Sequence, residues 1–392
     1  MLNENQEREL CYVVNIDGIE PIVGSDNCEA AIVGGWKVMV RKNTFAVGDK
    51  AVYFEIDSKV PETETFAFLA QKHYKVKTQK YTFGGKNPGF YSQGLLMSFS
   101  DFGWDDSTHE VGDFLTKELG VVYYEAEDNK RKANSSDKYK KMAQRNGKLF
   151  KHWPFRQLMR YKFGRKFLFV FFGRKRDKKS GWPEWVKKTD EERVQNMPWV
   201  LTNKDPFIVT EKIDGTSTTF TMKRGKFGKN EFYVCSRNVV FDKPDKQCFY
   251  DTNVYTEMAV RYDIENVLSD MLKEHKDWNW VTIQGETYGA GVQKRNYSLT
   301  NHDFAAFNFI TSADGRWNSY KAKEFLNSYG VPFVPIISTD YVLPDTVDEL
   351  INFAIGNSVI DGLPREGYVF RSQDGSVSFK AVSPEFLMKY HG

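Results

Sequence analysis

The stretch Phe207–Thr216, FIVTEKIDGT, contains the residues that decide how this chain folds and what it does. It opens with apolar and β-branched residues, which favour a buried strand. It then places Lys212 between the acids Glu211 and Asp214. On this spacing alone, the lysine could be an ordinary surface ion-pair residue. It could also be a nucleophile, because desolvation or a nearby cation can lower the pKa of a lysine amine from about 10.4.

Strand and helix signals alternate on the C-terminal side of this stretch. Apolar and β-branched runs predict strands over 207–214, 216–224, 231–238, 280–289, 304–311, 366–372 and 376–382. Apolar residues at helical spacing predict helices over 254–276 and 343–356. Upstream, Thr189 and Glu192 have the spacing of a capping box, which predicts a short helix. We therefore expect an α+β domain over 182–392.

The N-terminal part of the chain is rich in short strands. Residues Val, Ile, Tyr and Phe dominate the runs 11–23, 30–43, 50–57 and 94–99, which glycine-containing turns separate. Strands this short and this closely spaced suit a small closed barrel. The sequence predicts an OB-like barrel over 1–103 that binds nucleic acid, with an SH3-like barrel as the alternative.

Residues 104–181 are expected to be a linker with a strongly basic segment. Between Lys130 and Lys179 there are 19 Lys and Arg residues against the acids Asp137 and Asp177, which gives this segment a charge of +17. Since the whole chain carries +3, the remainder carries −14. Such a segment attracts a polyanion by releasing counterions. Its aromatic residues could stack on unpaired bases or pack beneath the basic surface, and the surface could also be merely solvated.

Composition and missing motifs exclude several classes of protein. A hydrophobic content of 41% argues against disorder of the whole chain. The P-loop, HExxH and GxSxG motifs are absent, and Gly289-Ala290-Gly291 lacks the third glycine of a dinucleotide fingerprint. No apolar run could span a bilayer, the first residues hold no signal-peptide core, and the four cysteines form no CxxC pair. We expect a soluble cytoplasmic monomer with reduced thiols.

Six short motifs follow one another in the order found in covalent nucleotidyltransferases. Lys212-Ile213-Asp214-Gly215-Thr216 resembles motif I, KxDG, of DNA ligases, RNA ligases and mRNA capping enzymes. The motifs that follow resemble Ia, III, IIIa, IV and V, and they are Ser236-Arg237-Asn238, Gly285-Glu286-Thr287-Tyr288-Gly289, Phe304-Ala305-Ala306-Phe307-Asn308-Phe309, Glu366-Gly367-Tyr368-Val369 and Ser378-Phe379-Lys380-Ala381-Val382. One KxDG arises easily by chance, whereas six motifs in this order do not.

The flanking segments resemble ATP-dependent RNA ligases, in particular the subgroup with an OB domain ahead of the transferase domain. The similarity lies in 188–196, 291–297 and 383–387 and in the N-terminal barrel. DNA ligases and capping enzymes usually carry an OB domain after motif V, whereas this chain ends twelve residues after Lys380.

Two positions depart from the pattern of these ligases. Val382 stands where most of them have a second lysine in motif V, so phosphate neutralisation would depend more on Lys380 and on metal. Ser217 stands where some RNA ligases have asparagine.

The resemblance implies a reaction that joins a 3′-hydroxyl to a 5′-phosphate. Lys212 would attack the α-phosphate of ATP and carry AMP, which then passes to the 5′-phosphate of an RNA strand before the 3′-hydroxyl displaces it. The partner would be nicked or broken RNA, on an RNA or DNA template, and the role would be RNA repair. A DNA ligase, a GTP-using capping enzyme and a catalytically inactive nucleic-acid-binding relative are the alternatives.

The resemblance also implies roles for the charged motif residues. Asp214, Glu286 and Glu366 would bind water on Mg²⁺ or Mn²⁺, since these cations prefer oxygen ligands. Lys380 would neutralise the α-phosphate and so assist Lys212 in catalysis.

Four further residues are expected to bind the nucleotide. Arg237 would hold the phosphate or ribose of AMP, and Asn238 belongs to the same site. Glu211 would accept a hydrogen bond from the adenine amino group, which favours ATP over GTP. Phe307 would stack on adenine, and its strand offers two alternatives, Phe304 and Phe309.

Overall fold

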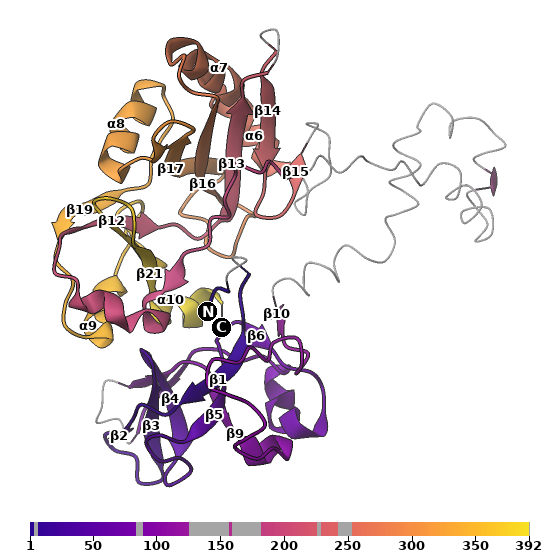
Figure 1. Cartoon of the computed structure of the whole chain (residues 1–392), viewed down its shortest axis with the longest axis vertical. Coiled ribbons are helices and arrows are strands. Elements are labelled where there is room, and N and C mark those ends of the chain that lie inside the picture. The colour runs from indigo at the N-terminus through magenta and orange to yellow at the C-terminus, as the bar shows by residue number, and fades with distance from the viewer. Residues whose placement is uncertain are drawn as a thin grey trace. The chain divides into compact units, whose positions relative to one another are not determined.

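The computed structural model describes residues 1–3, 7–83, 89–124, 157–158, 182–225, 229–241 and 253–391. Residues Met1–Val122 and Pro183–Gly392 belong to one compact unit, and Tyr123–Trp182 fall outside it. Figure 1 shows the strands and helices of the compact unit. Apart from 157–158, the basic segment 130–179 lies outside the described residues. The domain boundaries expected from the sequence stay predictions.

Short strands build the N-terminal part of the compact unit, as the sequence predicts. In chain order its elements are β1 (Cys11–Asn15), β2 (Gly18–Pro21), β3 (Cys28–Val33), β4 (Trp36–Arg41), β5 (Lys50–Phe54), β6 (Ser58–Lys59), the 3₁₀ helix η1 (Glu64–Lys72), β7 (Gln79–Tyr81), β8 (Phe90–Ser92), β9 (Leu95–Ser98), η2 (Phe99–Phe102) and β10 (Val122–Tyr123). One antiparallel sheet has the order β1-β5-β9, another has the order β2-β3-β4, and β7 pairs with β8. Buried residues alternate along β4, because successive strand residues point to opposite faces.

Two larger sheets build the C-terminal part. Its elements are β11 (Glu192–Arg193), η3 (Val194–Asn196), η4 (Pro198–Thr202), β12 (Phe207–Lys212), β13 (Thr216–Lys223), β14 (Glu231–Cys235), β15 (Val240–Phe241), α6 (Val254–Arg261), α7 (Ile264–Glu274), β16 (Trp280–Gly289), β17 (His302–Thr311), β18 (Gly315–Arg316), α8 (Ser319–Ser328), β19 (Ile336–Tyr341), α9 (Val347–Ala354), β20 (Gly367–Ser372), β21 (Ser378–Val382) and α10 (Pro384–Tyr390). The first sheet has the order β15-β14-β13-β16-β17-β18, and the second has the order β11-β21-β20-β12-β19. Among the described strands, β11 and β21 form the parallel pair, and the other pairs of these sheets are antiparallel.

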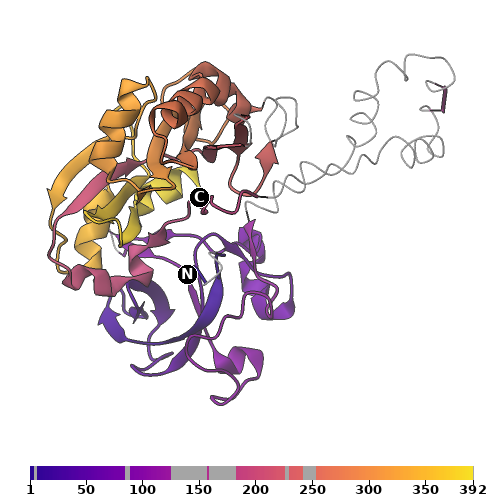
Figure 2. The same ribbon diagram turned by 45° about the horizontal axis from the view of Figure 1, so that its top comes forward.

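Each of these sheets has its own apolar core. Helices α6, α7 and α8 cover the six-stranded sheet, where Phe220 and Leu268 belong to one buried cluster (Figure 1, Figure 2). Helix α9 packs on the five-stranded sheet, where Phe207 and Leu350 belong to another cluster. The two sheets can therefore hold the ends of their strands in fixed positions, which is what a site built on strand ends requires.

Two local predictions are wrong. The expected helix 254–276 is divided into α6 and α7 at Asp263, whose φ of 48° is left-handed. Thr189 does not begin a helix; its hydroxyl oxygen lies 2.7 Å from that of Ser217, and Glu192 begins β11, which pairs with β21. In the second case, side-chain and strand contacts with distant parts of the chain determine the local structure.

Three described cysteines carry free thiols. Burial raises the pKa of the Cys235 thiol to about 12, and burial also raises that of Cys11. Both thiols therefore behave as small apolar packing groups. Among the helices of the described residues, none has the length and hydropathy needed to cross a membrane.

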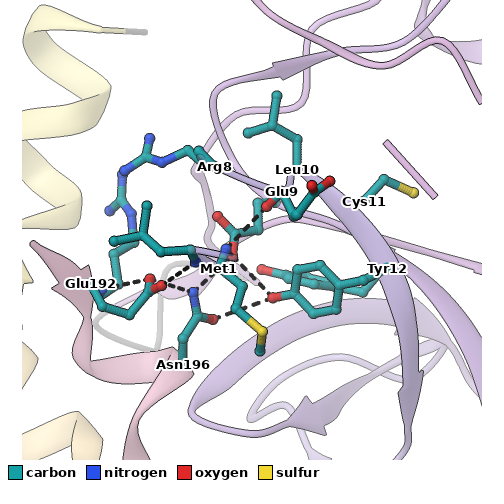
Figure 3. Close-up of polar contacts among 12 residues, drawn as sticks. Met1, Arg8, Glu9, Leu10, Cys11, Tyr12, Glu192 and Asn196 are labelled. Carbon is teal, nitrogen blue, oxygen red and sulfur yellow. Dashed lines mark hydrogen bonds and ion pairs between the residues drawn. The ribbon is translucent and has the colours of Figure 1, made fainter. Parts of the chain in front are cut away.

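The side chain of Asn196 connects the barrel to the C-terminal part (Figure 3). Its oxygen accepts a hydrogen bond from Trp36 Nε1 at 2.6 Å and lies 3.3 Å from the Tyr12 hydroxyl. Its nitrogen donates to Glu55 and to Glu192, both at 2.8 Å. The donor and the acceptor groups of this one amide thus both form hydrogen bonds that join the barrel to the C-terminal part.

The Glu55 carboxylate supplies the negative charge at the centre of this contact. It is 1% exposed, accepts a hydrogen bond from the Tyr12 hydroxyl at 3.0 Å and pairs with the α-ammonium group of Met1. Burial by itself would raise the pKa of Glu55, but the α-ammonium group and Arg8 lower it by more. The carboxylate therefore stays ionised, and Asn196 is one of the groups that satisfy it.

We expect Asn196→Ala to lower the free energy of unfolding by about 2–4 kcal/mol, because it leaves a buried indole N–H and a buried carboxylate short of partners. Urea denaturation of the full chain measures this change. Asn327→Ala, at an exposed position of α8, is the matched control and should change stability by less than about 0.5 kcal/mol. Equal losses in both variants would contradict the role given to Asn196.

Candidate active site

Lys212 is the last residue of β12, and its amine faces a carboxylate. Its Nζ atom lies 2.8 Å from each carboxylate oxygen of Glu366. In the sheet, Lys212 is opposite Gly367, the first residue of β20, and Glu366 directly precedes that strand. The antiparallel pairing of β12 with β20 therefore brings motifs I and IV together.

Two glycines permit close backbone approaches around the site, Gly215 to β16 and Gly367 to β21. A Cβ atom on Gly215 would lie 2.3 Å from the carbonyl oxygen of Thr287, and one on Gly367 would lie 2.1 Å from that of Ala381. Both obstacles are backbone atoms of paired strands, so a larger residue would force the strands apart. Steric constraints in this fold therefore explain why glycine stands at these positions of motifs I and IV.

Carboxylates determine the protonation of Lys212. Burial by itself lowers the pKa of this amine, but attraction to Glu366, Glu286 and Asp214 outweighs burial, and the net shift is upward. Lys212 is therefore an ammonium group as it stands in this structure. An ammonium group has no lone pair, so the nucleophilic role that the sequence predicts for Lys212 would require another positive charge to take its place beside the carboxylates.

Glu286 lies in β16, opposite Ser217 of β13. Burial and repulsion from Glu366 and Asp214 raise the pKa of Glu286 to about 8, although Lys212 acts in the opposite direction. The site therefore contains more carboxylate groups than its lysine can keep ionised at neutral pH.

Asp214 has an unsatisfied oxygen. Its Oδ1 atom lies 3.4 Å from His391 Nε2, whereas Oδ2 is buried without a hydrogen-bond partner in the part of the chain that the structure describes. Burial, with a further contribution from Glu366, raises the pKa of Asp214 although His391 opposes this. An unpartnered carboxylate oxygen beside two more carboxylates suits a hard divalent cation.

These carboxylates do not by themselves form a complete metal cage. Across residues 182–225, 229–241 and 253–391, as in the other described ranges, no three His, Cys, Asp or Glu side chains converge closely enough to hold an ion. Water would have to complete the coordination, which is the usual situation for Mg²⁺ because it gives up its water ligands reluctantly. The donor set therefore fits the water-mediated binding that the sequence implies.

Asp190 connects to several cationic side chains of the site. Arg237 forms an ion pair with it. Burial by itself would raise the pKa of Asp190, but Arg237, Lys380 and Arg8 lower it by more. The arginine of motif Ia is thus held by a carboxylate where the sequence predicts that it holds a phosphate. Its neighbour Asn238 is exposed in the turn between β14 and β15.

Lys380 is 6% exposed in β21. Burial and repulsion from Arg8, Arg193 and Lys212 lower its pKa well below the ordinary value, against the attraction of Asp190. A buried lysine with this environment gains a strong preference for its charged form when an anion approaches. The position fits the expected contact with a phosphate.

Arg193 is a further candidate for the site that its sequence position did not predict. This buried arginine is opposite Lys380 in the parallel pair of β11 and β21. Its Nη2 atom donates to Asp57 at 2.9 Å, whereas Nε and Nη1 lack hydrogen-bond partners among the described residues. Unused guanidinium donors beside a lysine suit phosphate oxygens. The only signal in the sequence was that 188–196 resembles RNA ligases.

Glu211 presents one free oxygen in a buried position. Its Oε2 atom accepts a hydrogen bond from the Val359 N–H at 3.0 Å, and Oε1 has no partner among the residues described. Burial raises the pKa of Glu211, while Ser358, Val359 and Arg365 act in the opposite direction. The free oxygen is available to an amino group of a ligand.

Phe307 lies at a β-bulge, where β17 has one residue more than β16. Its carbonyl oxygen accepts a hydrogen bond from Arg371 at 3.1 Å, and its ring is only partly buried. Bulges redirect side chains. The alternatives Phe304 and Phe309 are fully buried in the core and could not stack on a ligand without opening it.

Family models match both parts of the chain. An RNA ligase model matches residues 205–391, and an OB-fold domain model matches residues 10–97. The second match decides between the two barrels expected for the N-terminal part, in favour of the OB-fold. Among curated protein sequences, none matches this chain.

Solved structures of Naegleria gruberi RNA ligase are similar to this chain over nearly its whole length. A variant with ATP and manganese has 25% identity and a TM-score of 0.71, covering 98% of this chain and 100% of the other. The complex with pyrophosphate has 25% identity and a TM-score of 0.70, covering 98% and 99%. A variant with AMP and manganese has 25% identity and a TM-score of 0.70, also covering 98% and 99%. These matches confirm the α+β fold class with an N-terminal OB-fold.

We expect Glu286→Gln to stabilise the protein at alkaline pH when divalent ions are absent. The folded-state pKa of Glu286, about 8, lies above the reference value of 4.5, so folding favours the protonated form. This contribution is complete below about pH 4.5 and is lost as the pH rises towards about 8.

Because one pKa unit corresponds to about 1.4 kcal/mol, the variant should gain at least that much relative to wild type between about pH 5 and pH 8. Urea denaturation in EDTA at several pH values measures the difference. Parallel pH profiles of the two proteins would contradict the raised pKa.

Proposed function

This chain belongs to the RNA ligase family and carries an N-terminal OB-fold domain, and we propose that this ATP-dependent ligase joins a 3′-hydroxyl to a 5′-phosphate through an AMP group on Lys212. The supporting observation is the position of Lys212. It ends a buried strand, and its amine lies among carboxylates. A buried lysine and a buried arginine that suit phosphate, Lys380 and Arg193, lie in β21 and β11 of the same sheet. The substrate is nicked or broken RNA, on an RNA or DNA template.

Asp214, Glu286 and Glu366 would hold Mg²⁺ or Mn²⁺ through water. A bound divalent cation supplies positive charge beside these carboxylates, so their attraction no longer raises the pKa of Lys212. Burial then favours the neutral amine, which is the nucleophile. The Naegleria gruberi structures that contain manganese with ATP or AMP support this choice of cofactors.

The proposed reaction has three steps. Lys212 Nζ attacks the α-phosphorus of ATP, and an N–P bond forms as the bond to pyrophosphate breaks. A 5′-phosphate oxygen then attacks the same phosphorus, which frees the lysine and leaves AMP on the RNA end. Finally the 3′-hydroxyl attacks the 5′-phosphorus and AMP leaves.

Cationic side chains stabilise the phosphate oxygens in these steps. Charge that develops on non-bridging oxygens is best stabilised by donors already in position. Lys380 would contact the α-phosphate, and Arg193 has free donors for a neighbouring phosphate. Arg237 would leave its ion pair with Asp190 and bind the nucleotide. Asn238, in the same turn, would bind the nucleotide beside it.

Glu211 and Phe307 would select the base. The free oxygen of Glu211 would accept a hydrogen bond from the amino group of adenine, while Phe307 stacks on the ring. Guanine carries a carbonyl oxygen at the corresponding position, so GTP would leave the buried carboxylate unsatisfied. A site built around a buried polar group discriminates strongly in this way.

We expect Lys212→Arg to abolish the ATP-dependent adduct. The guanidinium group keeps the positive charge opposite Glu366, so the fold should persist, but it cannot lose its proton to become a nucleophile. Incubation with labelled ATP and Mg²⁺ or Mn²⁺, a denaturing gel and mass spectrometry locate the adduct. Lys204→Arg, at the ion pair with Asp345, is the control and should form it normally. Adduct in the Lys212 variant would refute the assignment.

We expect reversal of the charges in the segment 130–179 to weaken RNA binding and to flatten its salt dependence. Each phosphate that this segment no longer neutralises should reduce the slope of log K against log salt by about 0.7–0.9, because fewer counterions are released. Affinity for nicked duplex from about 50 to 200 mM salt measures the slope. Adduct formation on Lys212 should persist, since that step needs no RNA. An unchanged slope with normal sealing would assign this segment to another role.

A further inference from the structure

Arg295 lies in the segment that follows β16, and its guanidinium group is buried against a loop that precedes β20. Its side chain is 1% exposed, and it forms a two-pronged ion pair with Asp361, in which Nη1 lies 2.7 Å from Oδ2 and Nη2 donates to Oδ1. Its Nε atom donates to the carbonyl oxygen of Pro364 at 3.2 Å. Every nitrogen of the guanidinium group is therefore used, and the contacts of all three lie in one loop.

This loop, the Asn357–Pro364 loop, also contacts the side chain of Glu211 in β12. It is closed at its base by the pairing of Asn357 with Pro364. It supplies the Val359 N–H that donates to Glu211 Oε2 at 3.0 Å. The position of the loop therefore determines which oxygen of Glu211 is occupied and which one is left free.

Arg295 is also connected, through Tyr297, to the segment that contains Lys212. Its guanidinium carbon lies 4.2 Å from the centre of the Tyr297 ring. The Tyr297 hydroxyl accepts a hydrogen bond from the Asp214 N–H at 2.6 Å. One side chain therefore touches both the loop that holds Glu211 and the ring that holds Asp214, and these two residues flank Lys212 in the sequence.

A buried ion pair of this kind is not explained by stability. Desolvation of both ions offsets most of their attraction, whereas two-pronged pairing fixes the direction of both groups. The base of the loop is already held by Arg365, which donates to the carbonyl oxygens of residues 353–355 and of Asn357. What Arg295 adds is the position of the middle of the loop, including Asp361, whose charge acts on Glu211.

We propose that Arg295 is a positioning residue for adenine selection: it sets the Asn357–Pro364 loop so that Val359 occupies one oxygen of Glu211 and leaves the other for the adenine amino group. This rests on the proposed function, in which Lys212 receives AMP and Glu211 reads the base. Arg295 itself touches neither the nucleotide nor the reacting atoms in this proposal.

The test compares ATP with purine riboside triphosphate, which lacks the exocyclic amino group, in single-turnover adduct formation. Arg295→Lys keeps the charge but loses the two-pronged geometry. We expect its apparent KM for ATP to rise by about 10-fold or more, on the scale of one hydrogen bond to a charged group, and its preference for ATP over the analogue to fall similarly. The rate at saturating ATP, and the sealing rate at saturating pre-adenylylated nicked RNA, should stay within about twofold of wild type.

Two further variants separate positioning from a structural role. Asp361→Asn removes the other half of the pair and should reproduce the loss of preference, and the double variant should lose little more, because the two residues act as one unit. Arg224→Lys is the matched control, since Arg224 also binds backbone carbonyls, at Leu272, His275 and Trp278. It should leave the nucleotide preference unchanged.

An unchanged preference in both Arg295→Lys and Asp361→Asn would overturn the proposal, as would equal losses for ATP, for the analogue and for the sealing of pre-adenylylated RNA. If Arg295→Lys does not fold, the comparison of Asp361→Asn with wild type decides in the same way. Wild-type protein that forms no adduct with ATP would refute the proposed function instead, and the positioning role with it.

Discussion

The contact between the Lys212 ammonium group and the Glu366 carboxylate is the interaction on which the site depends. It exists because β12 and β20 pair antiparallel with Lys212 opposite Gly367. A shift of one residue in this register would turn one of the two side chains to the opposite face of the sheet, and the contact would be lost. The same contact keeps the lysine protonated, so the arrangement that positions the proposed nucleophile also prevents it from reacting alone.

Two groups of buried side chains lie around this contact, and each carries an excess of one charge. Glu286 and Asp214 have raised pKa values because they are buried beside Glu366, whereas Lys380 has a lowered pKa because it is buried beside arginines. A structure that buries like charges together stores an unfavourable energy that a ligand of the opposite charge can release. A divalent cation and a polyphosphate would bring both missing charges, which supports the proposed binding of a metal–nucleotide complex at this site.

Buried polar contacts outside the catalytic residues keep this geometry. The side-chain amide of Asn196 accepts a hydrogen bond from Trp36 and donates to Glu55 and Glu192. It therefore connects the barrel to the strand that contains Arg193. Arg295 performs a comparable task between Asp361 and Tyr297. In both places a buried polar side chain satisfies several polar partners at once, which fixes the direction of each of them.

The amino-acid sequence alone was enough for those features that depend on neighbouring residues. Runs of β-branched residues predicted β12, β16 and β20 nearly to their ends. The order of the motifs singled out Lys212, Glu286 and Glu366, whose charges interact in the structure; their joint action in catalysis stays a prediction. The sequence could not predict that Thr189 faces Ser217 or that Asp263 interrupts a helix. Nor could it single out Arg193, Arg295 or the free oxygen of Glu211. Those properties depend on which groups are buried together without water, and only the pairing of distant strands decides that.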